Sequence, residues 1–429
     1  MQSVYCPPNS VTAMRNVVVI GGGPAGMMAA IAAAEDGNHV VLLEKNEKTA
    51  KKLYITGKGR CNITNRCDPS EFLKNVVSNP KFLMSALNGF TPEDAVAFFE
   101  QEGVPLKTER GRRVFPASDA AGDICDAFRR VLKRLGVEVR TEEPVLSLEC
   151  DNDAVSAVIT KKARYLPDVV ILATGGMSYP GTGSTGDGFR FAGDLGLKTI
   201  DPVPALCPVV FAGVKSQERI LPLQDVRYPE GLSLKNVRIT VRTKKGEFSE
   251  FGEMLFTAKG VSGPAVLTVS SRINRIPLEG ATLSIDLKPA LDEKTLDQRL
   301  VKDFTALSNK QFKNSLGDLL PRSLIPMIVR LSGIDPERPV HTVTRAERTA
   351  LTALLKGLTF SIASLGSQAE AIVTAGGVAV SELFPKTMAS KKIKNLRFAG
   401  ELIDVDALTG GYNLQIAMAT GYAAGKGIL

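Results

Sequence analysis

Three glycines near the start of the chain have the spacing of a dinucleotide-binding turn. The segment Gly21–Gly26 reads G-G-G-P-A-G and matches the pattern G-x-G-x-x-G. In this pattern the first glycine permits a tight bend, the second lets the backbone approach a pyrophosphate, and the third lets the next helix pack closely. Glu44 follows 23 residues after Gly21, where a carboxylate can accept hydrogen bonds from ribose hydroxyls. The spacing therefore predicts a dinucleotide site.

Such a turn functions only between a strand and a helix, and the sequence predicts both. Residues 16–20 (NVVVI) form an apolar, β-branched run that is typical of a parallel strand buried on both faces. Residues 24–36 are rich in Ala and Met, which favours a helix that ends at Gly37. Residues 39–43 predict the next strand. Together they make one β-α-β unit whose helix N-terminus stabilises phosphate charge.

Two later glycine-containing segments indicate FAD rather than NAD. Ala173–Gly175 ends an apolar strand predicted at 168–173. Near the C-terminus, Gly400–Glu401 precedes a second turn, Gly410–Leu414, which opens a helix expected at 412–426. Backbone N–H groups at that helix start can stabilise negative charge on a reduced flavin. A NAD site needs only the first turn, whereas an extended FAD needs all three segments.

A second G-x-G-x-x-G match, Gly181–Gly186, raises the alternative of a separate NAD(P)H fold, with Asp201 lying 20 residues after its first glycine. This match begins eight residues after the predicted strand ends at Ala173, and Pro-rich sequence follows Asp201. Because a true fingerprint follows its strand directly, we expect a loop near the flavin instead.

Cysteine and histidine usage excludes several kinds of site. The chain has only two histidines, His39 and His341, and none of its six cysteines forms a C-x-x-C pair. We therefore expect no metal site, no iron–sulfur cluster and no dithiol relay, and the scattered thiols are typical of a reducing, cytoplasmic compartment. The cysteines are Cys6, Cys61, Cys67, Cys125, Cys150 and Cys207.

Charge and hydropathy argue for a small-molecule substrate and against nucleic-acid or membrane partners. The net charge of +8 is spread along the chain, and no basic block alternates with aromatic residues. Residues 1–14 lack a basic start and an apolar run, so we expect no signal peptide. The uncharged stretch 17–34 is interrupted by Gly-Gly-Gly-Pro, which argues against a membrane span.

The residue pattern of the sequence changes near residue 202 and returns to the earlier pattern near residue 370. Proline-containing, alternating segments dominate up to about 290, and helical patterns follow. We therefore expect an α/β fold with a Rossmann-like FAD-binding domain in two parts, 15–205 and 366–429. The inserted substrate domain is expected at 206–365, β-rich over 206–290 and helical over 291–365.

Several segments have sequences specific enough to indicate a family. They are Gly57–Asn65 (GKGRCNITN), Arg113–Pro116 (RVFP), Leu255–Thr257 with Gly260–Ala265 (LFT and GVSGPA), and Glu401–Ala417 (ELIDVDALTGGYNLQIA). In these segments the chain resembles the aminoacetone-oxidase or BaiN-type (YhiN-like) FAD-dependent oxidoreductases. The resemblance implies a GR2-type flavoprotein with an inserted domain. It also implies that Gly59–Asn62 and Gly410–Leu414 lie against the flavin, and that the backbone of Val145 meets adenine.

The glycine segments and the resemblance together define the expected cofactor contacts. These are Gly21, Gly23, Pro24, Ala25, Gly26, Glu44, Lys45, Gly59, Arg60, Cys61, Asn62, Val145, Ala173, Thr174, Gly175, Gly400, Glu401, Gly410, Gly411, Tyr412, Asn413 and Leu414. We interpret Cys61 as a packed thiol. Three residues are candidates for catalysis. Arg60 could place positive charge near flavin or substrate, or only hold its own loop. Tyr179 and Tyr412 could donate a proton, with packing as the alternative.

The expected reaction is hydride transfer through flavin N5. We expect NADH or NADPH to be the electron donor and an activated C=C in a small hydrophobic enone to be reduced. Two alternatives remain: oxygen-dependent oxidation of a small amine or aminoketone, and a tRNA-modifying or non-catalytic flavoprotein. The family often has Thr-His where this chain has Thr257-Ala258, so any action of that histidine on substrate is not expected here.

Overall fold

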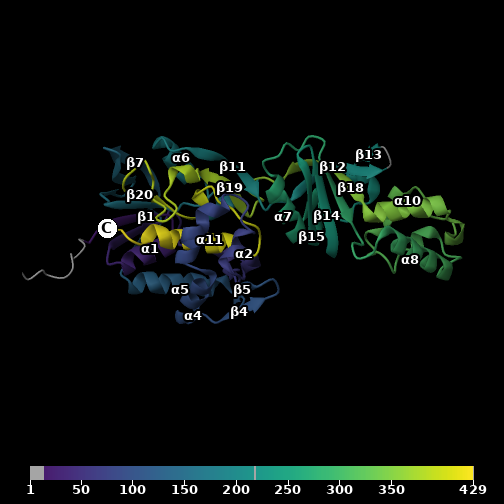
Figure 1. The fold of residues 1–429 in the computed structure, drawn as a ribbon, viewed down its shortest axis with the longest axis horizontal. Helices are drawn as coiled ribbons and strands as arrows, with labels where there is room; N and C mark the ends of the chain where they lie inside the picture. The colour runs from purple at the N-terminus through teal and green to yellow at the C-terminus, as the bar shows by residue number, and fades with distance from the viewer. Residues whose placement is uncertain (1–13, 217–218, 429) are drawn as a thin grey trace, which may run out of the picture. The chain divides into compact units, whose positions relative to one another are not determined.

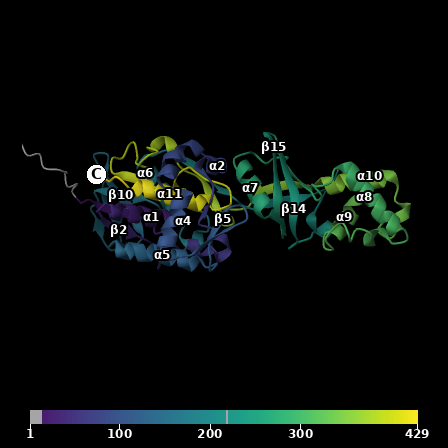
Figure 2. The ribbon, with the colours of Figure 1, turned by 60° about the horizontal axis from the view of Figure 1, so that its bottom comes forward.

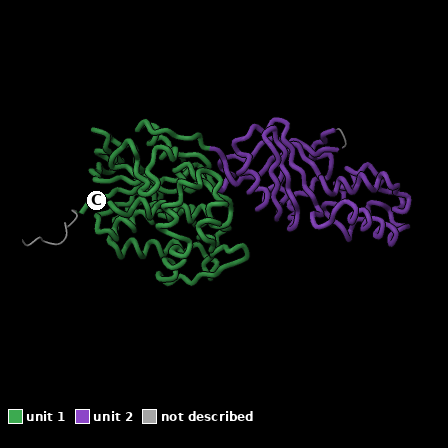
Figure 3. Tube along the Cα trace, in the orientation of Figure 1, with its two compact units in different colours: residues 1–202, 373–429 green, residues 203–372 purple. Residues whose placement is uncertain are grey.

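The protein divides into two compact units (Figure 3). The computed structural model describes residues 14–216 and 219–428. One unit comprises the described residues up to Pro202 together with those from Val373 onward, and the other comprises 203–372. The boundaries expected from the sequence are 205 and 365. Both observed boundaries fall at the strands β11 (Thr199–Ala205) and β19 (Val373–Val378), which pair with each other as a two-stranded sheet.

A five-stranded parallel sheet forms the centre of the first unit, in the order β20-β10-β1-β2-β6. Its middle strands are almost completely buried, because helices cover both faces of a parallel sheet. The predicted strands at 16–20 and 39–43 are confirmed residue for residue. The bounds are β1 (Asn16–Ile20), β2 (His39–Leu43), β6 (Glu138–Arg140), β10 (Val169–Leu172) and β20 (Leu396–Phe398).

The first and last helices of the chain pack on each other in this unit. The helices α1 (Pro24–Glu35) and α11 (Tyr412–Gly425) lie side by side in both views (Figures 1 and 2). A Cβ on Gly421 would lie only 2.3 Å from the carbonyl oxygen of Ala25. The close approach therefore requires glycine in α11, and it joins the two ends of the chain into one domain.

The remaining elements of this unit surround the central sheet. Its helices are α2 (Pro69–Leu73), α3 (Met84–Gly89), α4 (Pro92–Gln101), α5 (Ala121–Arg134) and α6 (Asp187–Asp194), with a 3-10 segment η1 (Leu53–Gly59). Two small antiparallel sheets have the orders β3-β5-β4 and β7-β8-β9. Their strands are β3 (Thr64–Asn65), β4 (Leu106–Glu109), β5 (Arg113–Pro116), β7 (Val145–Asp151), β8 (Ala154–Thr160) and β9 (Arg164–Tyr165).

The second unit is an antiparallel sheet that closes on itself. Seven strands have the order β13-β12-β16-β15-β14-β17-β18, and β12 also pairs with β18. The strands are β12 (Val209–Ser216), β13 (Arg219–Leu221), β14 (Ser233–Thr243), β15 (Gly246–Thr257), β16 (Gly260–Ser262), β17 (Thr282–Asp286) and β18 (Leu358–Leu365). The helices are α7 (Pro264–Ile273), which packs on β15, and α8 (Glu293–Ala306), α9 (Ile325–Ser332) and α10 (Arg345–Lys356).

The expectation of helix throughout 291–365 is wrong for its last eight residues, which form β18. Leu358, Phe360 and Ile362 are buried, while Thr359 and Ser361 between them are only half-buried. This alternation has the two-residue period of a strand, and pairing with β12 and β17 on either side outweighs the helical character of the preceding segment.

No helix in the described part of the chain combines the length and the apolar character that a membrane span requires.

Candidate cofactor site

The predicted glycine turn lies directly between β1 and α1. A Cβ on Gly21 would lie 2.4 Å from the carbonyl oxygen of Ala173, and one on Gly26 would lie 1.9 Å from that of Gly21. Packing of the protein itself therefore requires these two glycines. A Cβ on Gly23, in contrast, would meet nothing within 4 Å. The space at the N-terminus of α1 is open, as the approach of a pyrophosphate requires.

The three glycine segments meet at one edge of the central sheet. The N–H of Ala173 donates to the carbonyl of Ile20, and the N–H of Ala399 donates to the carbonyl of Leu172. A Cβ on Gly400 would lie 2.7 Å from the Cβ of Ala25 in the first turn. The carboxyl ends of β1, β10 and β20 are therefore neighbours, which is where ligands bind in open α/β sheets.

Glu44 is buried at the end of β2. Its Oε2 accepts a 2.8 Å hydrogen bond from the N–H of Gly22, and its Oε1 accepts one of 2.8 Å from the N–H of Asn46. A carboxylate has further acceptor sites, so a ribose hydroxyl can still be bound. The N–H of Glu143 donates to the carbonyl of Glu44 at 2.9 Å. This bond brings the start of β7, with Val145, beside the position expected for the adenosine half.

The second G-x-G-x-x-G match, Gly181–Gly186, lies against the end of β2. Lys45 Nζ is 2.6 Å from the carboxylate of Asp187, and Asn46 Nδ2 donates to the carbonyl of Thr182 at 3.2 Å. The strand β10 ends at Leu172, and a 3-10 turn, Pro180–Thr182, covers the start of the match, whereas in a β-α-β unit the strand would lead directly into it. The segment is therefore a loop that lies against Asn46 and against Lys45, which is predicted to contact the cofactor.

The loop after η1 and the C-terminal turn are in direct contact. Asn65 Nδ2 donates a 3.1 Å hydrogen bond to the carbonyl of Gly410. A Cβ on Gly411 would lie 2.4 Å from the carbonyl carbon of Thr64. Thr64 Oγ1 also donates to Gln415 Oε1 at 2.8 Å. The structure thus places the strand β3, which follows the segment Gly59–Asn62, against the turn Gly410–Leu414.

Two buried polar atoms, Asn62 Oδ1 and Thr174 Oγ1, find no hydrogen-bond partner among the residues that the structure describes. Buried polar groups are normally paired, so each of these atoms fits a polar group of a bound molecule. Both belong to residues predicted to contact FAD. Together with the open space at Gly23, they show that the residues present fit this cofactor.

Lys52 joins the site although the sequence analysis did not select it. Its Nζ lies 2.6 Å from Ser178 Oγ and 2.9 Å from Glu401 Oε2, and about one fifth of each charged side chain is exposed. Glu401 Oε1 accepts a 2.8 Å hydrogen bond from the N–H of Thr374. Glu401, predicted to contact FAD, is thus held by an ion pair. Nothing in the sequence distinguishes Lys52 from the adjacent Lys51.

Arg60 is held by nearby acidic and aromatic side chains. Its guanidinium pairs with Glu109 and Asp119, which raise its pKa, and it lies 4.2 Å from the ring centroid of Phe115. These contacts tie η1 to the β4–β5 hairpin. They explain the position of the Arg60 side chain without a bound cofactor. A role of Arg60 toward flavin or substrate stays a prediction.

The two tyrosine candidates differ in their surroundings. Tyr412 is buried, and its ring meets Phe72 edge-on at 5.0 Å. Burial raises the pKa of Tyr412 to about 12, so its hydroxyl remains protonated at neutral pH, as a proton donor requires. Tyr179 is half-buried and has the left-handed backbone conformation that non-glycine residues seldom adopt (φ 52°).

The thiols near the site are not activated. Cys61 is completely buried, and this burial raises its pKa to about 12. Burial also raises the pKa of Cys125 to about 11. Because the thiolate is the reactive form, neither side chain has the character of a redox thiol. The interpretation of Cys61 as a packed thiol agrees with this environment.

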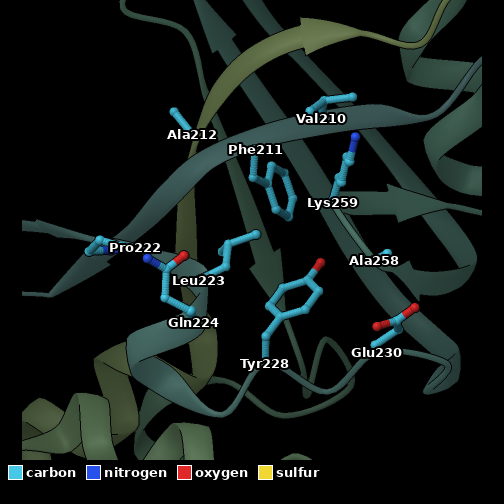
Figure 4. Close-up of a pocket in the computed structure, with 10 residues that line it drawn as sticks. All are labelled: Val210, Phe211, Ala212, Pro222, Leu223, Gln224, Tyr228, Glu230, Ala258 and Lys259. Atoms are coloured by element: carbon cyan, nitrogen blue, oxygen red, sulfur yellow. The ribbon is translucent and has the colours of Figure 1, made fainter.

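A separate pocket is lined entirely by residues of the second unit (Figure 4). Its volume is about 530 Å³, within the range of small-molecule sites. Phe211, Leu223 and Tyr228 supply apolar walls, and Glu230 and the segment Ala258–Lys259 lie at its edge. Ala258, where the family often has histidine, therefore lies at a pocket.

Residues 15–427 match the model of the HI0933-like protein Rossmann domain. The chain belongs to the HI0933-like family. It is an FAD-dependent oxidoreductase with a Rossmann-type α/β fold, as the resemblance implied.

This HI0933-like chain has relatives with different substrates. It is 30% identical over 403 residues to the 3-dehydro-bile acid delta(4,6)-reductase of Clostridium scindens, covering 91% of this chain and 93% of that protein. It is also 30% identical over 415 residues to the ribosomal RNA dihydrouridine synthase of Escherichia coli, covering 96% and 98%. A protein of the same name from Haemophilus influenzae is 27% identical over 403 residues, covering 91% and 93%.

Solved structures share the fold of the HI0933-like chain. The 3-ketosteroid-Δ4-(5α)-dehydrogenase of Rhodococcus jostii aligns with a TM-score of 0.50 at 16% identity, over 97% of both chains. The 3-ketosteroid Δ1-dehydrogenase of Sterolibacterium denitrificans aligns with a TM-score of 0.52 at 13% identity, over 96% of this chain and 99% of that one.

Proposed function

We propose that this protein reduces a C=C bond that is conjugated to a carbonyl group. The structural observation that supports a flavin reaction is the meeting of three glycine segments, from the start, middle and end of the chain, at one edge of the central sheet. FAD bound there supplies hydride transfer through its N5 position.

The reaction class rests on what two kinds of relative have in common. One is named for reducing a dehydro-bile acid with Δ4,6 double bonds, and the other for making dihydrouridine. Their substrates are unrelated, but both names describe the saturation of a C=C bond beside a carbonyl group. The shared chemistry is therefore better supported for this chain than either substrate.

The protein's own residues bind and orient the reactants. The open N-terminus of α1 at Gly23 is suited to the pyrophosphate, and Glu44 to a ribose. Glu401, held by Lys52, is suited to the ribityl chain. Tyr412 keeps its proton at neutral pH and is the candidate that donates a proton to the substrate carbon.

NADH or NADPH is the proposed electron donor. Cys61 and Cys125 are poor redox thiols because burial raises their pKa values, which disfavours a thiol donor. The Gly181–Gly186 loop does not follow a strand, so the nucleotide would bind only transiently rather than in a Rossmann unit of its own.

A small hydrophobic enone is the first proposed substrate. The pocket beside Phe211, Leu223 and Tyr228 has apolar walls and the polar groups of Glu230 and Lys259 at its edge. Such a lining suits a cyclic apolar compound with one polar end.

A uracil ring in ribosomal RNA is the second proposed substrate. The dihydrouridine synthase of E. coli aligns over 96% of this chain and 98% of its own length. The positive charge is also unevenly divided: residues 203–372 contain 23 Lys and Arg against 17 Asp and Glu, which gives +6 of the chain's +8. A basic domain favours contact with phosphates, whereas the lack of a basic block that alternates with aromatic residues predicted no nucleic-acid partner.

The test is an anaerobic titration of the FAD-loaded protein. Bleaching of the flavin by NADH or NADPH, followed by reoxidation on adding a 3-oxo-Δ4,6 bile acid or ribosomal RNA, would support the proposal and identify the substrate class. Reduction by a small amine with peroxide formation in air would instead establish the oxidase alternative. A protein that resists reduction by every donor would be a non-catalytic flavoprotein.

A further inference from the structure

The tip of the β4–β5 hairpin is joined to the segments expected to hold the flavin. Asn65 Nδ2 donates to the carbonyl of Gly111 at 2.9 Å, and the same amide group donates to the carbonyl of Gly410 at 3.1 Å. The N–H of Arg66 donates to the carbonyl of Arg112 at 2.8 Å. The backbone of the hairpin tip therefore lies close to the C-terminal turn that is expected to contact the flavin.

This hairpin is strongly basic. Residues 106–116 contain four basic side chains and one acidic side chain. Arg110, Arg112 and Arg113 are exposed, and Lys58 is exposed on the neighbouring η1 segment. The two segments are in contact, since a Cβ on Gly57 would lie 3.5 Å from the ring of Phe115.

Nearby carboxylates neutralise only some of these cations. Glu109 pairs with Arg60, Asp119 pairs with both Arg60 and Lys107, and Glu71 pairs with Arg112. The acidic groups around the hairpin are thus already occupied.

Three cations remain available. Within residues 14–216 and 219–428, the side chains of Lys58 and Arg110 make no hydrogen bond and no ion pair. Arg113 Nε donates a 3.1 Å hydrogen bond to the carbonyl of Arg110. The terminal nitrogens of Arg113 remain for a ligand, since Nη2 is 3.9 Å from Glu109, at the limit of an ion pair, and the side chain is 45% exposed. Lys58 also has a left-handed backbone conformation (φ 60°), which is rare outside functional or tightly constrained positions.

We propose that Arg110 and Arg113, with Lys58 beside them, bind an oxyanion of the substrate next to the flavin. An arginine pair presents planar forks of N–H groups that match a carboxylate or a phosphate. The inference rests on the proposed function, and it covers both proposed substrates, because a bile acid carries a carboxylate and RNA carries phosphates. The anion would hold the substrate while its C=C bond faces the flavin.

The experiment compares the double variant Arg110→Ala/Arg113→Ala with the wild-type FAD-loaded protein. Arg66→Ala is the control for the loss of an exposed arginine, since Arg66 directly follows β3 of the same small sheet but pairs with Glu93 at 3.0 Å. One arm measures kcat and KM for a 3-oxo-Δ4,6 bile acid and for its methyl ester. The other measures the affinity of a labelled oligouridylate at several salt concentrations, without turnover.

A carboxylate ligand predicts that KM for the acid rises about tenfold in the double variant, while kcat and the KM for the ester stay within about twofold. A phosphate ligand predicts weaker oligouridylate binding and a salt slope smaller by about two. Either result supports the site and identifies the anion. Unchanged KM and unchanged affinity, or equal effects in Arg66→Ala, would overturn it.

Failure of the proposed function gives a different pattern. In that case the wild-type protein reduces neither the bile acid nor RNA. The oxyanion site is then tested by equilibrium binding, in which the affinities of the wild-type protein and the double variant for the oligouridylate and for the saturated bile acid are compared. A loss of either affinity in the double variant would still support the oxyanion site, and unchanged affinities would overturn it.

Discussion

Asn65 and Gly410 are 345 residues apart in sequence, yet the side-chain amide of Asn65 donates a 3.1 Å hydrogen bond to the Gly410 carbonyl. The same amide donates to the carbonyl of Gly111. One side chain therefore holds together the loop after η1, the hairpin tip and the C-terminal turn.

The Asn65→Ala variant is expected to release FAD about tenfold faster, because two carbonyls lose their donor and the C-terminal turn is no longer held. The dissociation rate can be measured by the return of flavin fluorescence on dilution. Asn38→Ala is the control, since Asn38 also donates to a carbonyl, that of Ala33, but at the far end of α1. Equal release rates in the two variants would contradict the assignment.

Substitutions at two glycines of the first turn are expected to have different effects, one on cofactor binding and the other on folding stability. Gly23→Val should leave the melting temperature of the apoprotein unchanged, because a side chain there meets open space, yet it should abolish FAD binding. Gly26→Ala should destabilise the apoprotein by several kcal/mol, because its Cβ would lie 1.9 Å from the Gly21 carbonyl. Circular dichroism melts and FAD titration distinguish the two. A Gly23→Val protein that stays yellow would refute the pyrophosphate assignment.

Lys52→Met should weaken FAD binding, whereas Lys51→Met should not. Removing Lys52 leaves the half-buried carboxylate of Glu401 without its ionic partner, and we expect a loss of about 1–3 kcal/mol in FAD affinity. Lys51 pairs with Glu47 on the surface, where an ion pair contributes little. Fluorescence quenching gives both dissociation constants, and similar values for the two variants would show that Lys52 has no special role.

The second unit is expected to lose folding stability at low pH because its Glu347 becomes protonated. Hydrogen bonds from Arg338 and from the N–H of Thr344 lower the pKa of Glu347 to about 2. Because the folded-state pKa lies below the unfolded value, the stabilisation is present above about pH 5 and is lost as the pH falls toward 2. Glu347→Gln should lower the free energy of unfolding by about 1 kcal/mol at pH 7.

The pH dependence of this difference is the critical part of that prediction. Urea unfolding of both proteins at several pH values should show the gap between them closing as the pH falls from 5 toward 2. A gap that is independent of pH would mean that the variant loses packing rather than charge.

The cofactor half of the molecule was largely predictable from the sequence. The strands at 16–20 and 39–43 are continuous apolar runs, and their burial on both faces leaves few alternatives. Gly21 and Gly26 mark places where backbone meets backbone, so their spacing alone indicates close contacts within the turn.

Other features depend on tertiary contacts that local sequence does not encode. Lys51 and Lys52 are adjacent and alike, but only Lys52 reaches the partner Glu401, which lies 349 residues later in the chain. The strand β18 follows a helical pattern directly, and its state is decided by pairing with β12 and β17. The carboxylates that pair with Arg60 lie on the β4–β5 hairpin and at Asp119, so these ion pairs could not be predicted from the sequence around Arg60.

A single-turnover experiment tests the central claim most directly. The FAD-loaded protein is reduced under anaerobic conditions with dithionite, freed of excess reductant, and mixed with a 3-oxo-Δ4,6 bile acid or with ribosomal RNA. The proposed function predicts that the flavin reoxidises and that one C=C bond is saturated for each flavin. The proposed function would be contradicted if neither substrate reoxidised the reduced flavin, while an amine reduced the flavin and oxygen reoxidised it with formation of peroxide.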